Sequence, residues 1–155
     1  VSVLLDAAPP SGDAARRSPH FSLRAYPYVL YDLVLYIPRM LMNVNGRGVA
    51  AARAVYPDIA LTDTLLVHDE LQRAFGKVSF KQGGSAAGHN GVKSVQHHLG
   101  NDVPRIRIGI DRPLDGNVSA YVLGSMPPDW LETCAHGEVL ERLWSTLQTW
   151  CLSRI

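Results

Sequence analysis

Residues 77–110, KVSFKQGGSAAGHNGVKSVQHHLGNDVPRIRIGI, decide the fold. Segments 77–81 and 104–110 both alternate between apolar and polar residues, a pattern that predicts β-strands. A glycine-rich loop over 83–91 and a helix over 91–99 lie between them, and Gly100 is suited to end that helix. A strand, a loop, a helix and a second strand in this order indicate an α/β domain.

The apolar positions of this stretch predict how each element packs. Val92, Val95 and Leu99 recur at i, i+3 and i+7, so they form one face of the helix. The strand over 77–81 points Val78 and Phe80 to one side. The strand over 104–110 points its isoleucines inward and its arginines, Arg105 and Arg107, outward.

Further elements extend this pattern in both directions along the chain. Residues 28–37, YVLYDLVLYI, predict a buried strand, and a helix with Asn45 as N-cap is expected to run to Tyr56. Residues 64–67 predict a short strand. An amphipathic helix is expected from about Asp129 to the end, and its apolar stripe consists of Leu140, Leu143, Trp144, Leu147 and Cys151.

These elements predict one α/β domain over residues 28–155, with a twisted mixed sheet flanked by helices. Residues 1–27 are expected to be loosely structured, because Pro9-Pro10 and Ser18-Pro19 are loop signals. The chain begins at Val1 rather than at a methionine, so we expect its N-terminus to be incomplete.

The composition excludes several classes of protein. The chain has 155 residues, of which 46% are hydrophobic and 19% charged, and a disordered chain would be more polar. No run reaches the roughly 20 apolar residues of a membrane span. Cys134 and Cys151 form no metal-binding or disulfide pattern, so free thiols in a reducing compartment are expected.

The charges are unevenly distributed. The net charge of the chain is +1. Residues 73–112 contain seven basic side chains and only two acidic ones, Asp102 and Asp111. One face of the protein is therefore expected to attract an anion.

The glycine-rich loop is not a nucleotide-binding P-loop. Gly83 and Gly88 have the spacing of the two P-loop glycines, but His89 and Asn90 replace the lysine and the hydroxyl residue that phosphates and magnesium require. A loop that brings a ligand close to a helix N-terminus and a simple flexible connector both remain open.

Two further segments are candidates for chemistry. His68-Asp69-Glu70 ends a predicted strand, where a carboxylate can orient a histidine or simply cap a turn. Asn43 follows another strand and either bonds its own backbone or presents its amide to a substrate. The histidines lack metal-ligand spacing, so no metal site is expected, and His97 and His98 are expected on a solvated helix face.

Basic residues form two stripes on the predicted strands. Lys77 and Lys81 share one strand face, and Arg105 and Arg107 share another. Neighbouring strands would join them into a positive surface suited to a phosphate backbone, although an ordinary solvated sheet face has the same pattern.

Taken together, the segments resemble the bacterial-type peptidyl-tRNA hydrolases, and their motif sequences are closer to those of the eukaryotic members. The matching segments follow the family order and span roughly residues 28–125. They are MNVNGR (42–47), VHDEL (67–71), FGK (75–77), GGSAAGHNGVKS (83–94), RIRIGIDRP (105–113) and YVL (121–123).

The resemblance implies a metal-free enzyme that hydrolyses the ester joining a peptide to the 3′ end of tRNA, which recycles tRNA from aborted translation. It implies that Asn43 contacts the substrate near the ester and that Asp69 orients and charges the catalytic histidine. Asn90 would position the attacking water or bind the developing oxyanion.

The resemblance also implies residues that bind tRNA. Lys81 and Arg105 match basic positions that hold acceptor-stem phosphates, and His89 belongs to the same glycine-rich motif. Leu41 occupies the place of an aromatic residue beside the 3′ end of tRNA, so stacking there is lost.

The chain departs from the family in one respect. The family opens with a Gly-Leu-Gly-Asn-Pro-Gly strand and a Thr-Arg-His-Asn segment whose histidine is the general base, and this sequence contains neither. We therefore expect a sheet without the first family strand and impaired activity, since general-base catalysis contributes about 10²–10⁴-fold.

Two alternatives to an enzyme follow from that departure. One is a non-catalytic module of the same fold that binds tRNA or an intron RNA. The other is a nonfunctional fragment. For the hydrolase, we expect a monomer without a membrane anchor, in the cytoplasm or alternatively in the mitochondrion.

Overall fold

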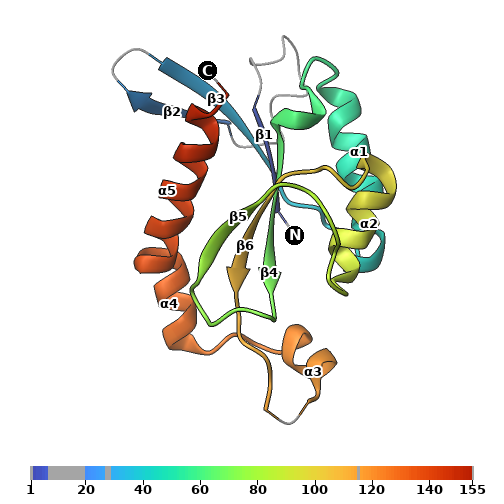
Figure 1. Ribbon diagram of the computed structural model, residues 1–155, viewed down its shortest axis with the longest axis vertical. Coiled ribbons are helices and arrows are strands. Elements are labelled where there is room, and N and C mark those ends of the chain that lie inside the picture. The colour runs from blue at the N-terminus through green and yellow to red at the C-terminus, as the bar shows by residue number, and fades with distance from the viewer. Residues whose placement is uncertain (1, 7–19, 27–28, 115, 155) are drawn as a thin grey trace. The chain divides into compact units, whose positions relative to one another are not determined.

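A strand-rich N-terminal half and a helical C-terminal half make up the chain in the computed structural model, which describes residues 2–6, 20–26, 29–114 and 116–154 (Figure 1). The strands are β1 (Ser2–Asp6), β2 (His20–Tyr26), β3 (Val29–Tyr36), β4 (Thr64–Glu70), β5 (Val78–Lys81) and β6 (Arg105–Gly109). The helices are α1 (Asn45–Val55), α2 (Asn90–Leu99), α3 (Val118–Leu123), α4 (Pro128–His136) and α5 (Glu138–Leu152), and the short 3₁₀ turns are η2 (Met42–Val44) and η3 (Leu61–Asp63).

The strands form one mixed sheet in the order β2-β3-β1-β4-β6-β5. The pairs β2–β3, β3–β1 and β1–β4 are antiparallel. Leu66 N donates to Pro104 O and Ile110 N donates to Glu70 O, so β4 and β6 advance in the same direction and are parallel. The predicted α/β class with a mixed sheet flanked by helices is confirmed.

The N-terminal segment contains more regular structure than its sequence indicated. Residues 1–27 were expected to be loosely structured, but β1 pairs with both β3 and β4, and β2 pairs with β3. Neither strand contains the Gly-Leu-Gly-Asn-Pro-Gly motif of the family. The proline-rich stretch that motivated the expectation lies within residues 7–19, outside the described residues.

The chain divides into two compact units. The first unit comprises residues 1–68 and 81–105, and the second comprises 69–80 and 106–155. The chain crosses from one unit to the other inside β4, β5 and β6. The units are therefore interleaved in sequence rather than arranged as successive domains.

Helices α1 and α2 lie side by side in the first unit and enclose its apolar core (Figure 1). The core brings together residues from both helices, from strands β3 and β4 and from the segments that follow α1 and α2. Its buried members are Val34, Val49, Tyr56, Ile59, Leu66, Val92, Val95, Leu99 and Val103. Burial of each such side chain contributes about 1.5–3 kcal/mol to folding, so this packing holds the two helices together.

The helix around Val92 has the predicted periodicity. Val92, Val95 and Leu99 are buried, and Gly100 ends α2 with a φ of 87°, a conformation that glycine adopts without strain. The N-cap predicted for α1 differs: Asn45 is the first helical residue, and Val44 precedes it without a capping side chain.

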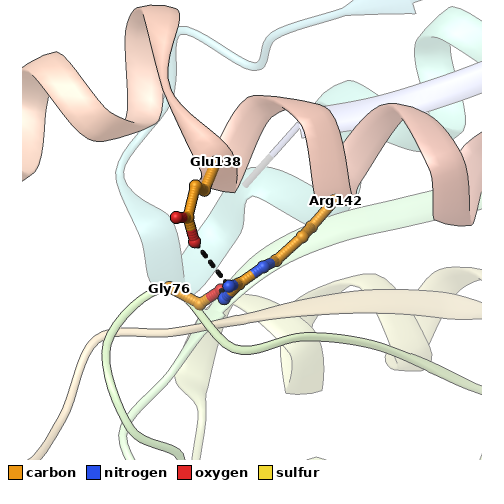
Figure 2. A network of polar contacts seen from close by, with 3 residues as sticks. All are labelled: Gly76, Glu138 and Arg142. Carbon is orange, nitrogen blue, oxygen red and sulfur yellow. Dashed lines mark hydrogen bonds and ion pairs between the residues drawn. The ribbon is translucent and has the colours of Figure 1, made fainter.

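The second unit has two C-terminal helices instead of the single predicted one. The helical conformation is interrupted at Gly137, which separates α4 from α5. Leu147 and Cys151 of the predicted stripe are buried, whereas Trp144 is exposed. Figure 2 shows Arg142 of α5 donating to Glu138 at 2.6 Å, and the same guanidinium reaches Gly76 O at 3.3 Å.

A ring stack also joins loop and helix in the second unit. The rings of Phe75 and Trp130 stack with centroids 3.8 Å apart.

Among the described residues, no helix combines the length and the apolar character needed to cross a bilayer.

Candidate functional site

The first unit contains an open pocket of ≈ 660 Å³ that runs along one face of α2, beside the N-terminus of α1. Residues from η2, from the first turn of α1 and from one face of α2 line it. They are Asn43, Val44, Arg47, Asn90, Lys93, Ser94, His97 and His98. The pocket therefore combines two asparagine amides with several cationic or ionisable side chains.

Local backbone structure brings Asn43 and Asn90 into this pocket. Asn43 lies in η2, the single turn that Val44 N closes by donating to Leu41 O at 3.0 Å, immediately before α1. Asn90 is the first residue of α2, directly after the glycine-rich loop. Both side chains are exposed, so both amides are accessible to a ligand.

The electrostatics of the pocket favour an anionic ligand. Arg47 and Lys93 are exposed cations, and no carboxylate is among the residues that line the pocket. The positive end of the α2 dipole, at Asn90, adds positive potential at the same place. A phosphate group would find both charge and hydrogen-bond donors there.

His89 caps the helix that Asn90 begins. Its Nδ1 accepts hydrogen bonds from Gly91 N at 3.1 Å and Val92 N at 3.3 Å, so that nitrogen is unprotonated. The ring meets that of buried His68 edge-to-face at 5.0 Å. His89 is not among the lining residues, and in this structure it fixes the start of α2.

Arg105 does not face outward from β6, although the alternation of the sequence predicted that it would. The side chain is only 1% exposed. Its guanidinium donates to Gly83 O at 2.6 Å, Gly84 O at 2.8 Å and Ser85 O at 3.1 Å. The prediction that Arg105 faces outward is wrong because three loop carbonyls converge on this side chain, which sequence alternation does not reveal.

The glycine-rich loop is therefore fixed by hydrogen bonds and is not a flexible connector. Besides Arg105, Gln96 Nε2 donates to Gly84 O at 2.6 Å, and Gly84 N donates to Asn101 O at 2.8 Å. Gly83 has a φ of 53° and Gly84 a φ of 82°, so the loop needs glycine at both positions. Because the loop leads directly into α2, these hydrogen bonds also help to fix the position of Asn90, the first residue of that helix.

The remaining predicted residues lie at different places. Lys81 ends β5, half-buried, with Nζ 3.3 Å from Ser85 O. Leu41 is 77% exposed and precedes η2. Asp69 belongs to the second unit, where it is half-buried on β4, one residue after His68.

Several residues that line the pocket were not predicted from the sequence. These are Val44, Arg47, Lys93, Ser94, His97 and His98. Helical spacing is the signal that could have found most of them, because Arg47 follows Asn43 by four residues and Ser94 follows Asn90 by four. His97 and His98 are exposed, as predicted.

The second unit has its own basic pocket of ≈ 320 Å³. Its lining residues are Glu70, Gln72, Arg73, Ala74, Lys77 and Arg107. Burial and the charge of Arg73 lower the pKa of Arg107, whereas Glu70 raises it. Burial, the largest of these effects, and the nearby Arg73 both disfavour the charged guanidinium, so a bound anion would stabilise it.

These features define an α/β protein with a basic pocket, whose two asparagine amides lie at the N-termini of packed helices. Among the described residues, no group of three or more histidine, cysteine, aspartate or glutamate side chains is arranged to hold a metal ion.

Comparison with known proteins identifies the family. The sequence model described as "Peptidyl-tRNA hydrolase" matches residues 16–155, so the chain belongs to the peptidyl-tRNA hydrolase family.

Individual relatives show the extent of the similarity. The chain is 46% identical to a peptidyl-tRNA hydrolase of Pelobacter propionicus over 64% of this chain and 51% of the relative. It is 37% identical to one from Campylobacter curvus over 90% and 72% of the two chains. A probable peptidyl-tRNA hydrolase of Mus musculus is 48% identical over 63% and 48%. The chain spans about half the length of most of these relatives.

A solved structure supports the same fold. The crystal structure of peptidyl-tRNA hydrolase from Acinetobacter baumannii matches with a TM-score of 0.62 and 29% sequence identity. The match covers 77% of this chain and 62% of that one.

Proposed function

We propose that this protein hydrolyses the ester bond between a peptide and tRNA in peptidyl-tRNA, which returns tRNA from aborted translation. The observation that carries the proposal is the pocket of the first unit, which places Asn43 and Asn90 beside exposed Arg47 and Lys93. The membership of the chain in a family of hydrolases named for this substrate supports the same reaction.

The proposed reaction assigns a role to each asparagine. Water attacks the ester carbonyl carbon, the bond from that carbon to the ribose oxygen breaks, and the products are a peptide with a free carboxyl group and a tRNA hydroxyl. Asn90 positions the water or donates to the developing oxyanion, and Asn43 binds the substrate next to the ester. By the family resemblance, Asp69 would orient a general-base histidine that accepts the proton from water, although the sequence lacks the Thr-Arg-His-Asn segment that supplies this histidine in the family.

Cationic side chains would bind the phosphates of the tRNA 3′ end and acceptor stem. Arg47 and Lys93 line the pocket, and Lys81 lies at the foot of the glycine-rich loop. Leu41 offers an exposed apolar surface next to Asn43. We propose that His89 and Arg105 act on this site through α2 and the loop that they hold, and not by contact with tRNA phosphates.

A second function is favoured by one observation. The sequence contains no Thr-Arg-His-Asn segment, the source of the general base in the family resemblance. A protein with the basic pockets but without that base would bind tRNA or another RNA without turnover.

Hydrolysis of peptidyl-tRNA by the purified protein and its Asp69→Ala and Asn90→Ala variants tests these assignments. We expect the protein to release free peptide and each variant to lose at least about 10²-fold in rate. Circular dichroism controls for folding. Full activity in both variants would overturn the site assignment.

The same experiment separates the two functions. Salt-sensitive binding of tRNA by the unmodified protein without release of peptide would replace the hydrolase with the RNA-binding module. We further propose that the protein acts as a monomer in the cytoplasm, with the mitochondrion as the alternative compartment. Size-exclusion chromatography with light scattering and imaging of the tagged protein test these two points.

A further inference from the structure

Helices α1 and α2 approach each other closely about one helical turn from the two asparagines. A Cβ atom on Gly46 would lie 2.0 Å from Ser94 O and 2.5 Å from Ser94 C, which is closer than any side chain tolerates. Glycine is therefore required at position 46 for the helices to pack at this separation. Figure 1 shows α1 and α2 side by side.

A hydrogen bond spans the same contact. Gly46 N donates to Ser94 Oγ at 2.9 Å, although the two residues are 48 positions apart in the chain. Gly46 N belongs to the first turn of α1, where backbone N–H groups lack partners within the helix. Val44, the N-cap of α1, supplies no side-chain acceptor, so Ser94 caps α1 from the neighbouring helix.

Ser94 also contacts a second residue that lines the pocket. The Nδ1 atom of His98 lies 2.9 Å from Ser94 O, one turn further along α2. Ser94 is half-buried and lines the pocket together with His98, Asn43 and Asn90. The serine therefore contacts α1 through its hydroxyl and the wall of the pocket through its carbonyl.

The contact between Gly46 and Ser94 lies close to the two asparagines of the proposed reaction. Asn43 is three residues before Gly46, and Asn90 is four residues before Ser94. Each asparagine lies at the start of its helix or in the turn before it, so a shift of α1 against α2 changes the separation of their amides. The backbone contact at Gly46 limits how closely the helices approach, and the hydroxyl of Ser94 keeps them from separating.

We propose that Ser94 is a positioning residue that sets the separation of the Asn43 and Asn90 amides by capping α1 from α2. The catalytic consequence rests on the proposed hydrolase function, whereas the geometric consequence does not. Misplacement of such groups by about 1 Å can lower a rate by about 10²-fold.

The test compares Ser94→Ala with Ser94→Thr, which retains the hydroxyl, and with Ser145→Ala on the exposed face of α5 as a matched control. The first readout is the NMR signals of the Asn43 and Asn90 side-chain amides, which require no turnover. We expect Ser94→Ala to shift both sets of signals, Ser94→Thr to restore them, and Ser145→Ala to leave them unchanged.

The second readout is hydrolysis of peptidyl-tRNA. We expect Ser94→Ala to lower kcat about tenfold with little change in KM, because positioning acts on the reacting groups rather than on overall binding. Ser94→Thr should recover most of the rate. Gly46→Ala, which forces the helices apart, should shift the same amide signals if the variant folds.

The outcomes separate this proposal from the proposed function. Unchanged Asn43 and Asn90 signals in Ser94→Ala, matching Ser145→Ala, would overturn the positioning role. Shifted signals in a protein that never releases peptide would support the positioning role and reject the hydrolase function.

Discussion

The two units of the molecule each contain a basic pocket, and the pockets differ in what holds them. The pocket of the first unit lies along α2 beside the N-terminus of α1 and contains two asparagines, Arg47 and Lys93, without a carboxylate. The pocket of the second unit combines Arg73, Lys77 and Arg107 with Glu70 and Gln72.

This difference indicates different tasks. Helix N-termini fixed by a packed core can hold amide donors in place for a developing charge, which is the arrangement that catalysis requires. Three cations with a carboxylate among them chiefly provide attraction for an anion. We therefore expect amide substitutions in the first pocket to affect rate and charge substitutions in either pocket to affect binding.

The largest expected effect distinguishes the two pockets by their amides. Asn43→Ala should lower kcat/KM for peptidyl-tRNA by about 10²–10³-fold, since in the proposed reaction it removes an amide that binds the substrate next to the ester. Gln72→Ala removes an exposed amide from the second pocket and should change the same constant less than about threefold. Steady-state kinetics of both variants measures the contrast, and equal losses would remove the distinction between the pockets.

A smaller effect compares two arginines of β6, one from each unit. Arg105→Met should lower the free energy of unfolding by about 3 kcal/mol, because it removes a buried cation that three loop carbonyls share. Arg107→Met should cost less than about 1 kcal/mol, since this side chain is half-exposed.

Urea denaturation of both variants gives the two free energies. Similar values for Arg105→Met and Arg107→Met would mean that the loop does not depend on Arg105. A loss confined to Arg105→Met would show that the loop is part of the stable core of the first unit.

The smallest expected effect concerns tRNA binding. Lys93→Ala in the first pocket and Lys77→Ala in the second should each weaken tRNA binding a few-fold and lower the salt slope of log Kd by about 1. Binding titrations over a range of salt concentrations measure both quantities. If tRNA contacts both lysines, the affinity of the double variant should fall by the product of the two single losses. If Lys77 makes no contact, the salt slope of log Kd for Lys77→Ala should equal that of the unmodified protein.

Local patterns in the sequence were sufficient for several elements of the fold. Alternation predicted β5 and β6, and the spacing of Val92, Val95 and Leu99 predicted α2 and its end at Gly100. These patterns work because strands and helices repeat with fixed periods, so the buried face is visible in the order of residues. The motifs also led to Asn43 and Asn90, which the structure brings to one pocket.

Tertiary structure alone decided the features that depend on distant residues. The pairing of β1 with β3 and β4, the burial of Arg105 under Gly83–Ser85 and the contact of Gly46 with Ser94 each join residues far apart in the chain. Arg105 and Arg107 alternate identically in the sequence, yet only Arg105 is buried, because partners for a charged side chain come from the fold rather than from its neighbours. The sequence by itself thus indicated the family and the elements with clear periodicity, such as β5, β6 and α2, whereas the packing of α1 on α2 determined which side chains form the pocket.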